Sequence, residues 1–234
     1  MDSTRRWVRL PLALFILLCA GATHAANAVH TIYLVRHGAY LPDSRADPQA
    51  GPGLSTLGIA QARMIATRLR AMPIAFDSVT SSTLARAQQT AAIMHEQIAD
   101  ADGSASPLLS ECTPPAAALK VDEVAANACR QRLDTAFATF FKTPSDASRY
   151  DVLVCHGNVI RYFVTKALGV DTRAWPAMSV AHASLTIIEV HRNGAMRLVA
   201  VGDIGHVPPP LQSWGDDSDP QLATPGIESF ATPK

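Results

Sequence analysis

The sequence predicts an α/β fold, a three-layer sandwich in which a mostly parallel central sheet carries helices on both faces and ends in an antiparallel hairpin. Short apolar or β-branched runs at 31–35, 76–80 and 150–155 alternate with amphipathic helical patterns, as in sheets of parallel strands joined by crossover helices. Two further strand-like runs, at 185–190 and 196–201, flank Asn193-Gly194, which is a strong signal for a hairpin turn.

Each helix is predicted from a capping residue or from apolar spacing. After a polar loop at 40–53, Ser55 or Thr56 suits the N-cap of one helix, and Ser81-Ser82 suits that of the next. A longer helix is predicted over 121–141, after a loop at 102–118. Apolar residues recur at helical spacing in the first two helices and in the one after 150–155: Ile59, Ala62, Ala66 and Leu69; Leu84, Ala87, Ala91, Met94 and Ile98; Ile160, Phe163, Val164, Ala167 and Leu168.

The chain divides into a predicted signal peptide at 1–28, one folded domain at 29–206 and a Pro-, Asp- and Ser-rich tail at 207–234. A basic start, an apolar run at 10–19 and small residues at 23–28 have the order of an export signal. The apolar run is about half the roughly 20 residues that a membrane helix needs. We therefore expect a periplasmic or secreted protein without a stable membrane anchor after cleavage. A twin-arginine signal around Arg5-Arg6 and a lipoprotein signal at Cys19 are alternatives.

Composition limits the classes of partner. A chain of 234 residues with 48% hydrophobic residues can bury one substantial core. Lys and Arg total 20, Asp and Glu total 20, and no basic tract stands out, so no nucleic-acid partner is predicted. A phosphate group would have to be bound by a few focused cations. The sequence makes no prediction of the oligomeric state.

The cysteines predict a disulfide bond if the chain is exported. Three cysteines remain after the predicted cleavage, namely Cys112, Cys129 and Cys155, an odd number for an oxidising compartment. Cys155 ends an apolar strand and is expected to be a buried thiol. Cys112 lies in a loop and Cys129 in a predicted helix, so we favour a bond between these two, with two separate thiols as the alternative. No His or Cys spacing indicates a metal site.

Two predicted strands end in the same way. Arg36-His37-Gly38 follows the first, and His156-Gly157 follows the strand at 150–155. Because parallel strands end at the same edge of a sheet, both histidines should lie there, where ligands of open α/β sheets bind. Arg86 lies early in a predicted helix and Glu111 in a loop expected near this edge. Each residue alone would be structural or solvated, but together they indicate a site.

This set of residues suits phosphoryl transfer. The reaction needs in-line attack, positive charge around the equatorial oxygens and a proton for the leaving oxygen. Arg36 and Arg86 offer forked donors to those oxygens. One neutral imidazole can attack phosphorus and form a phosphohistidine, and the other can donate to the same oxygens.

These motifs, together with Ser81-Ser82, Gln89-Thr90 and Leu34-Val35, resemble the histidine phosphatase (phosphoglycerate mutase-like) superfamily over most of 30–205. The resemblance implies that His37 is the phosphorylated nucleophile and Glu111 the general acid and base. It also implies a phosphate pocket of Arg36, Arg86, His156 and Gly157, with His156 counted among the catalytic residues.

Three longer stretches resemble the mitochondrial Ser/Thr phosphatase branch of the superfamily, namely 36–40, 156–162, and 202–206 followed by Pro208-Pro209. The acid phosphatase branch has His-Asp where this chain has His156-Gly157, and the mutases usually follow the first glycine with serine, where this chain has Ala39. We therefore predict a phosphomonoesterase that uses neither metal nor cofactor. Its partner would be a phosphorylated small molecule or phosphoprotein. A mutase-like phosphotransferase and a non-catalytic phospho-ligand-binding protein are the alternatives.

Overall fold

The computed structural model describes residues 28–117 and 119–214. Within them lies a six-stranded sheet in the order β3-β2-β4-β1-β5-β6. Most of the predicted signal peptide, 1–27, and most of the predicted tail, 215–234, fall outside the described residues. The strands are β1 (Val29–Arg36), β2 (Ser78–Ser82), β3 (Asp102–Ser106), β4 (Arg149–Cys155), β5 (Leu185–His191) and β6 (Met196–Asp203).

The pairing of the strands agrees with the predicted fold class. β1, β4, β2 and β3 run parallel to their neighbours, whereas β5 pairs antiparallel with both β1 and β6. β1 is central, and its side chains are apolar on both faces, as expected of a strand covered on both sides. Ile32 and Leu34 belong to one hydrophobic cluster, and Tyr33 and Val35 belong to the other.

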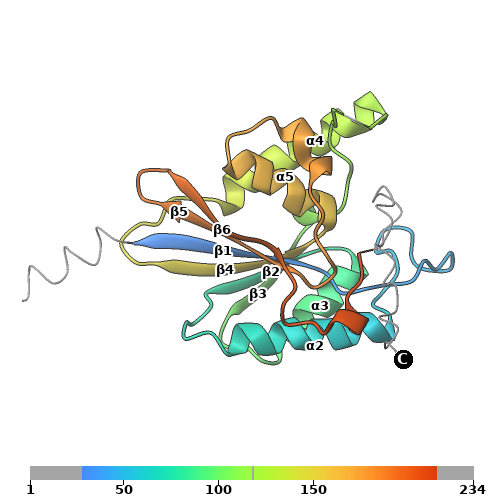
Figure 1. Ribbon diagram of the computed structural model, residues 1–234, viewed down its shortest axis with the longest axis horizontal. Helices are drawn as coiled ribbons and strands as arrows, with labels where there is room; N and C mark the ends of the chain where they lie inside the picture. The colour runs from blue at the N-terminus through green and yellow to red at the C-terminus, as the bar shows by residue number, and fades with distance from the viewer. Residues whose placement is uncertain (1–27, 118, 215–234) are drawn as a thin grey trace, which may run out of the picture.

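Two pairs of helices cover the sheet, one pair on each face (Figure 1). Helices α2 and α3 lie on one face, and α4 and α5 lie on the other. Ser55 caps α2 by accepting a hydrogen bond from the N–H of Gly58, as predicted. The helices are α2 (Thr56–Arg70), α3 (Ala85–His95), α4 (Glu123–Phe140) and α5 (Gly157–Ala167), and the short 3-10 helices are η1 (Pro107–Leu109), η2 (Thr172–Ala177) and η3 (Pro209–Leu211).

Two local predictions were wrong. Ser81 and Ser82 do not cap α3, because β2 extends to include them, although the Ser82 hydroxyl accepts a hydrogen bond from the N–H of Leu84, which precedes the helix. The stretch predicted as a loop at 102–118 contains β3 and η1. β3 carries no apolar alternation, and its side chains are mostly exposed. It forms through main-chain pairing with β2 at the edge of the sheet, which its sequence does not signal.

Residues 207–214, which the sequence assigns to the tail, pack on the domain. Val207 is buried. The N–H of His182 donates to the carbonyl of Ser213, and the amide of Gln61 on α2 donates to the carbonyl of Leu211. This short segment therefore returns to the edge of the sheet where the strands β1 and β4 end.

The structure contains the disulfide bond predicted between Cys112 and Cys129, with Cα atoms 5.8 Å apart. The bond joins the loop after η1 to α4. Cys155 is a buried free thiol, as predicted, and burial raises its pKa. Among the described residues, no helix has both the length and the apolar character to cross a membrane.

Candidate active site

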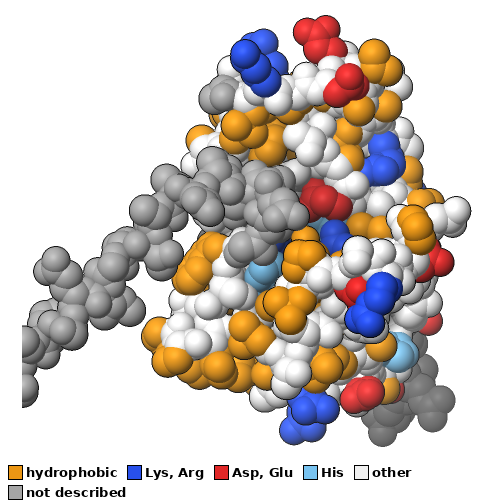
Figure 2. Space-filling view, turned by 90° about the vertical axis from the view of Figure 1, so that its right-hand side faces the viewer, with side chains coloured by type: hydrophobic (Ala, Val, Ile, Leu, Met, Phe, Trp, Pro, Cys, Tyr) orange, Lys and Arg blue, Asp and Glu red, His pale blue; other side chains and the backbone are white. Residues whose placement is uncertain are grey.

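The predicted site residues meet at the edge where β1 and β4 end. This edge faces the viewer in Figure 2, and acidic, basic and histidine side chains lie together in a hollow near its centre. The ring centroids of His37 and His156 are 4.9 Å apart. Arg86 reaches His37 from α3, since its Nε lies 3.1 Å from the Nε2 atom of His37. The parallel pairing of β1 and β4 therefore brings two histidines together that are far apart in the sequence.

His37 is a buried imidazole with a defined tautomer. Its Nδ1 lies 2.8 Å from the carbonyl of Gly38, and a carbonyl can only accept, so Nδ1 carries the proton. Nε2 accepts from Arg86 and therefore holds the lone pair. Burial, followed by the nearby His156, Arg36, Arg86 and His182, lowers the pKa of His37 well below its usual value. The ring is thus neutral near pH 7, with the lone pair of Nε2 directed at a cation.

His156 is the N-cap residue of α5 and is also fully buried. Its Nε2 lies 2.8 Å from the hydroxyl of Ser82, at the end of β2. Its Nδ1 is buried and makes no hydrogen bond within the described part of the chain. Burial and then the charges of Arg86, Arg36 and Arg132 lower its pKa. Nδ1 is therefore the ring atom that remains available to a ligand.

Arg36 lies beside the start of α5. Its Nη1 donates to the carbonyls of Val180 and Trp214, at 2.6 and 3.2 Å. A Cβ added to Gly157 would lie 3.6 Å from the guanidinium carbon of Arg36. The first amides of α5 and this guanidinium are therefore neighbours, and a helix N-terminus with a cation beside it favours an anion.

Arg86 is fixed by its own helix and by an aromatic ring. Its guanidinium lies over the ring of Tyr40, 4.6 Å from the centroid, a cation–π distance. The hydroxyl of Thr90 donates to the carbonyl of Arg86 and accepts from the N–H of Gly38. This hydroxyl links the first turn of α3 to the residue that follows the histidine.

Gly38 and Gly58 bring α2 against the end of β1. A Cβ on Gly38 would lie 2.4 Å from the carbonyl oxygen of Gly58, and a Cβ on Gly58 would lie 1.9 Å from that of Ala39. Both distances are far below contact, and both neighbours are main-chain atoms. Only glycine fits at either position, so the glycine after His37 serves close packing of the backbone.

Glu111 lies in the loop that follows η1 and is partly exposed. One carboxylate oxygen accepts from the N–H of Cys112 at 3.0 Å. The loop is tied to the site on both sides, because Ser110 contacts Thr83 at 3.0 Å and Asn158 of α5 donates to the carbonyl of Cys112 at 3.1 Å. Glu111 is thus placed between the ends of β2 and β4 by its neighbours.

His182 is a further residue of the site that the sequence analysis missed. It is buried, with its ring centroid 5.4 Å from that of His37 and 6.3 Å from that of Tyr40. It precedes β5, which is antiparallel to β1. The residue before such a strand lies at the edge where parallel strands end, so the predicted hairpin was the signal that could have identified it.

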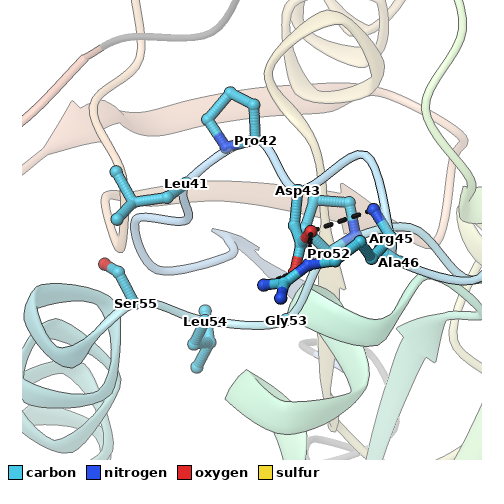
Figure 3. Close-up of a pocket in the computed structure, with 9 residues that line it drawn as sticks. All are labelled: Leu41, Pro42, Asp43, Arg45, Ala46, Pro52, Gly53, Leu54 and Ser55. Carbon is cyan, nitrogen blue, oxygen red and sulfur yellow. Dashed lines mark hydrogen bonds and ion pairs between the residues drawn. The ribbon is translucent and has the colours of Figure 1, made fainter.

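The loop between β1 and α2 encloses a hollow of about 450 Å³ next to the site. Figure 3 shows the ion pair of Asp43 and Arg45 at one end, and Leu41, Leu54 and Ser55 at the other. The N–H of Ala85 donates to the carbonyl of Ala50, which attaches the loop to the start of α3. Among the described residues, no group of three or more His, Cys, Asp or Glu side chains is placed to hold a metal ion.

Comparisons with known proteins match the fold and the motifs. The family described as histidine phosphatase superfamily (branch 1) matches residues 32–125 and 113–204. The mitochondrial serine/threonine-protein phosphatase Pgam5 of Caenorhabditis elegans is 33% identical over 79% of this chain and 66% of its own length. The corresponding Xenopus tropicalis protein is 31% identical over 80% of this chain and 69% of its own length. This chain thus spans about two thirds of the curated relatives that it matches.

A solved structure agrees as well. The phosphoglycerate mutase of Plasmodium falciparum superposes with a TM-score of 0.57 at 26% identity, covering 78% of this chain and 96% of that one. The resemblance, the fold class and the phosphatase class predicted from the sequence are confirmed by these matches.

The predicted periplasmic or secreted location is contradicted. The curated relatives are mitochondrial proteins by name, and this finding overturns the expectation of export. A basic and apolar N-terminal segment was interpreted as an export signal, but such composition does not by itself distinguish one targeting route from another. The disulfide prediction assumed an oxidising compartment, yet the bond is present in the structure.

Proposed function

The chain belongs to the histidine phosphatase superfamily, and we propose that it hydrolyses phosphate monoesters by passing the phosphoryl group through Nε2 of His37. The observation that carries this proposal is the tautomer of His37. The carbonyl of Gly38 keeps the proton on Nδ1, and burial keeps the ring neutral, so a lone pair on Nε2 faces the guanidinium of Arg86.

In the first step, the phosphoryl group takes the place of Nε2 as the acceptor of the Arg86 N–H. The Nε2 lone pair forms a bond to phosphorus while the bond between phosphorus and the leaving oxygen breaks. Arg36, Arg86 and the amides at Gly157 stabilise the charge on the equatorial oxygens. His156 contributes Nδ1, which would carry a proton and donate to one of the same oxygens. We assign the proton of the leaving oxygen to Glu111.

In the second step, water attacks phosphorus and the bond to Nε2 breaks. Glu111, now a carboxylate, accepts the proton of the water, so that it returns to its starting state. Inorganic phosphate is released and His37 is again neutral. The partial exposure of Glu111 supports this role, since its carboxylate has to meet both the leaving group and water.

For the substrate, we propose phosphoserine or phosphothreonine in proteins. Two features support this. The matched relatives are named serine/threonine-protein phosphatases, and the open hollow at 41–55 leaves room beside the phosphate pocket for residues that flank a phosphorylated side chain. We propose 29–206 as the catalytic domain, a range that includes the residues matched by the family.

The test is to trap the intermediate. The full chain is mixed with a ³²P-phosphoserine peptide, quenched within milliseconds and digested. Radioactivity that is labile in acid and stable in alkali should map to the peptide containing His37. The variant His37→Ala should neither turn over nor carry label, whereas His191→Ala, on the far end of β5, should do both. Turnover by His37→Ala at the wild-type rate would refute the proposal.

A mutase-like activity is the competing function, and the similarity to the Plasmodium phosphoglycerate mutase is the observation that favours it. The same labelled chain distinguishes the two. Chased with water alone, a phosphatase releases inorganic phosphate. Chased with 3-phosphoglycerate, a mutase transfers the label to the sugar acid faster than to water.

A further inference from the structure

Ala183 has a backbone conformation that alanine seldom adopts. Its φ is 55°, and it is the one residue other than glycine with a positive φ in the described chain. The left-handed region is unfavourable for an L-residue, because its Cβ comes too close to the following carbonyl oxygen. Ala183 is also fully buried, between His182 and the start of β5. Strain of this kind persists only where neighbouring groups impose it, and such residues cluster at functional sites.

The N–H of Ala183 bonds to the main chain of the nucleophile. It donates to the carbonyls of Arg36 and His37, at 3.1 and 3.2 Å. The imidazole of His37 is oriented by the next carbonyl along, that of Gly38. The conformation of Ala183 therefore acts on the same short stretch of backbone that aims Nε2.

The carbonyl of Ala183 is held by His206, which belongs to the 202–206 motif. Nε2 of His206 lies 3.0 Å from this carbonyl and so carries the proton. Nδ1 of His206 lies 3.1 Å from Nη1 of Arg68, and since a guanidinium only donates, Nδ1 accepts. Arg68 in turn is paired with Asp203 at 2.5 Å. His206 is thus a neutral imidazole fixed between α2 and the strained turn.

We propose that His206 is a positioning residue for the phosphoryl transfer. By bonding the carbonyl of Ala183, it keeps Ala183 in the left-handed conformation and so holds the main chain of His37, and the ring of His182 beside it, in place. The inference rests on the function proposed for His37. It assigns to the 202–206 motif a role at a distance from the phosphate pocket, transmitted through hydrogen bonds only.

Two substitutions of His206 test this. In His206→Gln, the side-chain amide offers an N–H to Ala183 and an oxygen to Arg68, as the neutral imidazole does. In His206→Ala both bonds are lost. With p-nitrophenyl phosphate, we expect kcat of His206→Ala to fall about tenfold or more while KM stays within about threefold, since a misplaced nucleophile slows the chemical step. His206→Gln should recover most of the wild-type kcat, and His191→Ala serves as the matched histidine control.

Ala183→Gly isolates the strain. Glycine adopts a positive φ without cost, so the double variant Ala183→Gly/His206→Ala should regain part of the lost kcat. If His206→Ala does not fold, the double variant and His206→Gln decide the matter. Wild-type kcat in His206→Ala would overturn the proposal. So would equal losses in the Ala and Gln variants without recovery by Ala183→Gly. A wild-type chain that forms no phosphohistidine would instead overturn the function proposed for His37.

Discussion

At Arg86 one guanidinium makes two contacts that an ammonium could not make together. Its Nε–H points at Nε2 of His37, and its plane lies over the ring of Tyr40. We expect Arg86→Lys to lower kcat by about 10²-fold, because a lysine keeps the charge but loses the forked donors toward the phosphoryl oxygens. Steady-state assays with a phosphopeptide measure this. Arg63→Lys, an exposed arginine on α2, should retain wild-type kinetics.

A small effect of Arg86→Lys, less than about fivefold, would mean that charge alone suffices at this position. Arg36 would then be the residue whose forked guanidinium donors bind the oxygens of the phosphoryl group. That outcome would contradict the proposal that Arg86, which faces Nε2 of His37, also binds the transferred phosphoryl group.

Glu111 should matter in proportion to how poor the leaving group is. An alkoxide needs a proton in the transition state, and a general acid contributes about 10²–10⁴-fold. Nitrophenolate leaves without one. Glu111→Gln preserves the oxygen that accepts from Cys112, so the loop should keep its conformation. Stopped-flow assays of this variant with p-nitrophenyl phosphate should show a burst of nitrophenol followed by slow turnover, because the second step still needs the base.

With an alkyl phosphate the same variant should show a large loss and no burst. Glu123→Gln, an exposed residue in the first turn of α4, is the matched control. If Glu111→Gln slowed both substrates equally and gave no burst with either, Glu111 would not be the general acid, and another carboxylate near the site would have that role.

The disulfide joins the loop of Glu111 to α4 across 17 residues. A bond closing a loop of this size stabilises the fold by about 3 kcal/mol in the chain-entropy model. We expect reduction to lower the free energy of unfolding by that order, measured by urea titration with and without a phosphine reductant. In the folded chain Cys155 should not exchange with the bond, because burial raises the pKa of its thiol and keeps it unreactive.

The background for this measurement is Cys19→Ser, so that Cys112 and Cys129 are the cysteines that change state. Iodoacetamide should label neither of them before reduction and both after it. Label on Cys112 and Cys129 in the unreduced native chain would contradict the bond. The variant Cys112→Ser should match the reduced protein in stability, since it leaves Cys129 of α4 packed in the hydrophobic core.

Most elements were predictable because their own side chains define them. β1 and β4 are apolar on both faces, and α5 carries a continuous apolar stripe, so their own apolar patterns identify them. β3 was missed because its five residues contain no apolar alternation, and only the partner strand β2 determines it. His182 was missed for a related reason, since its place beside His37 depends on how β5 pairs and on no local motif.

Histidines that are neutral in the folded chain should make the free energy of unfolding depend on pH. Burial is the main cause that lowers the pKa values of His37, His156 and His206 in the folded chain. Below the unfolded pKa of about 6.5 the unfolded state therefore binds more protons, and the folded state loses about 1.4 kcal/mol per pH unit for each of His37 and His156, and less for the partly exposed His206. We expect the free energy of unfolding to fall steadily between about pH 7 and pH 5.

Urea titrations at a series of pH values test this. In His156→Gln the free energy of unfolding should fall less steeply with pH, by about 1.4 kcal/mol per pH unit, because one titrating histidine is missing. A free energy of unfolding that stays constant or rises from pH 7 to pH 5 would contradict the neutral state of His37 and His156.

Asp151 contributes to stability over a different, more acidic pH range. Although burial opposes it, hydrogen bonds from His30, Arg149 and Ser78 lower the pKa of Asp151 to about 2, so its contribution is lost only in stronger acid.

The loop at 41–49 can vary in sequence without changing the position of His37, because the base of the loop is fixed. Both ends of the loop meet at one point, where Gly38 and Gly58 close on the backbone and the N–H of Ser55 donates to the carbonyl of Ala39. Tyr40 and Leu54 pair just above it. Because lengthening a surface loop costs little, residues 41–49 can be exchanged or extended without moving His37. Exchange of residues 41–49 during evolution can therefore alter substrate preference, while the residues proposed for phosphoryl transfer stay in place.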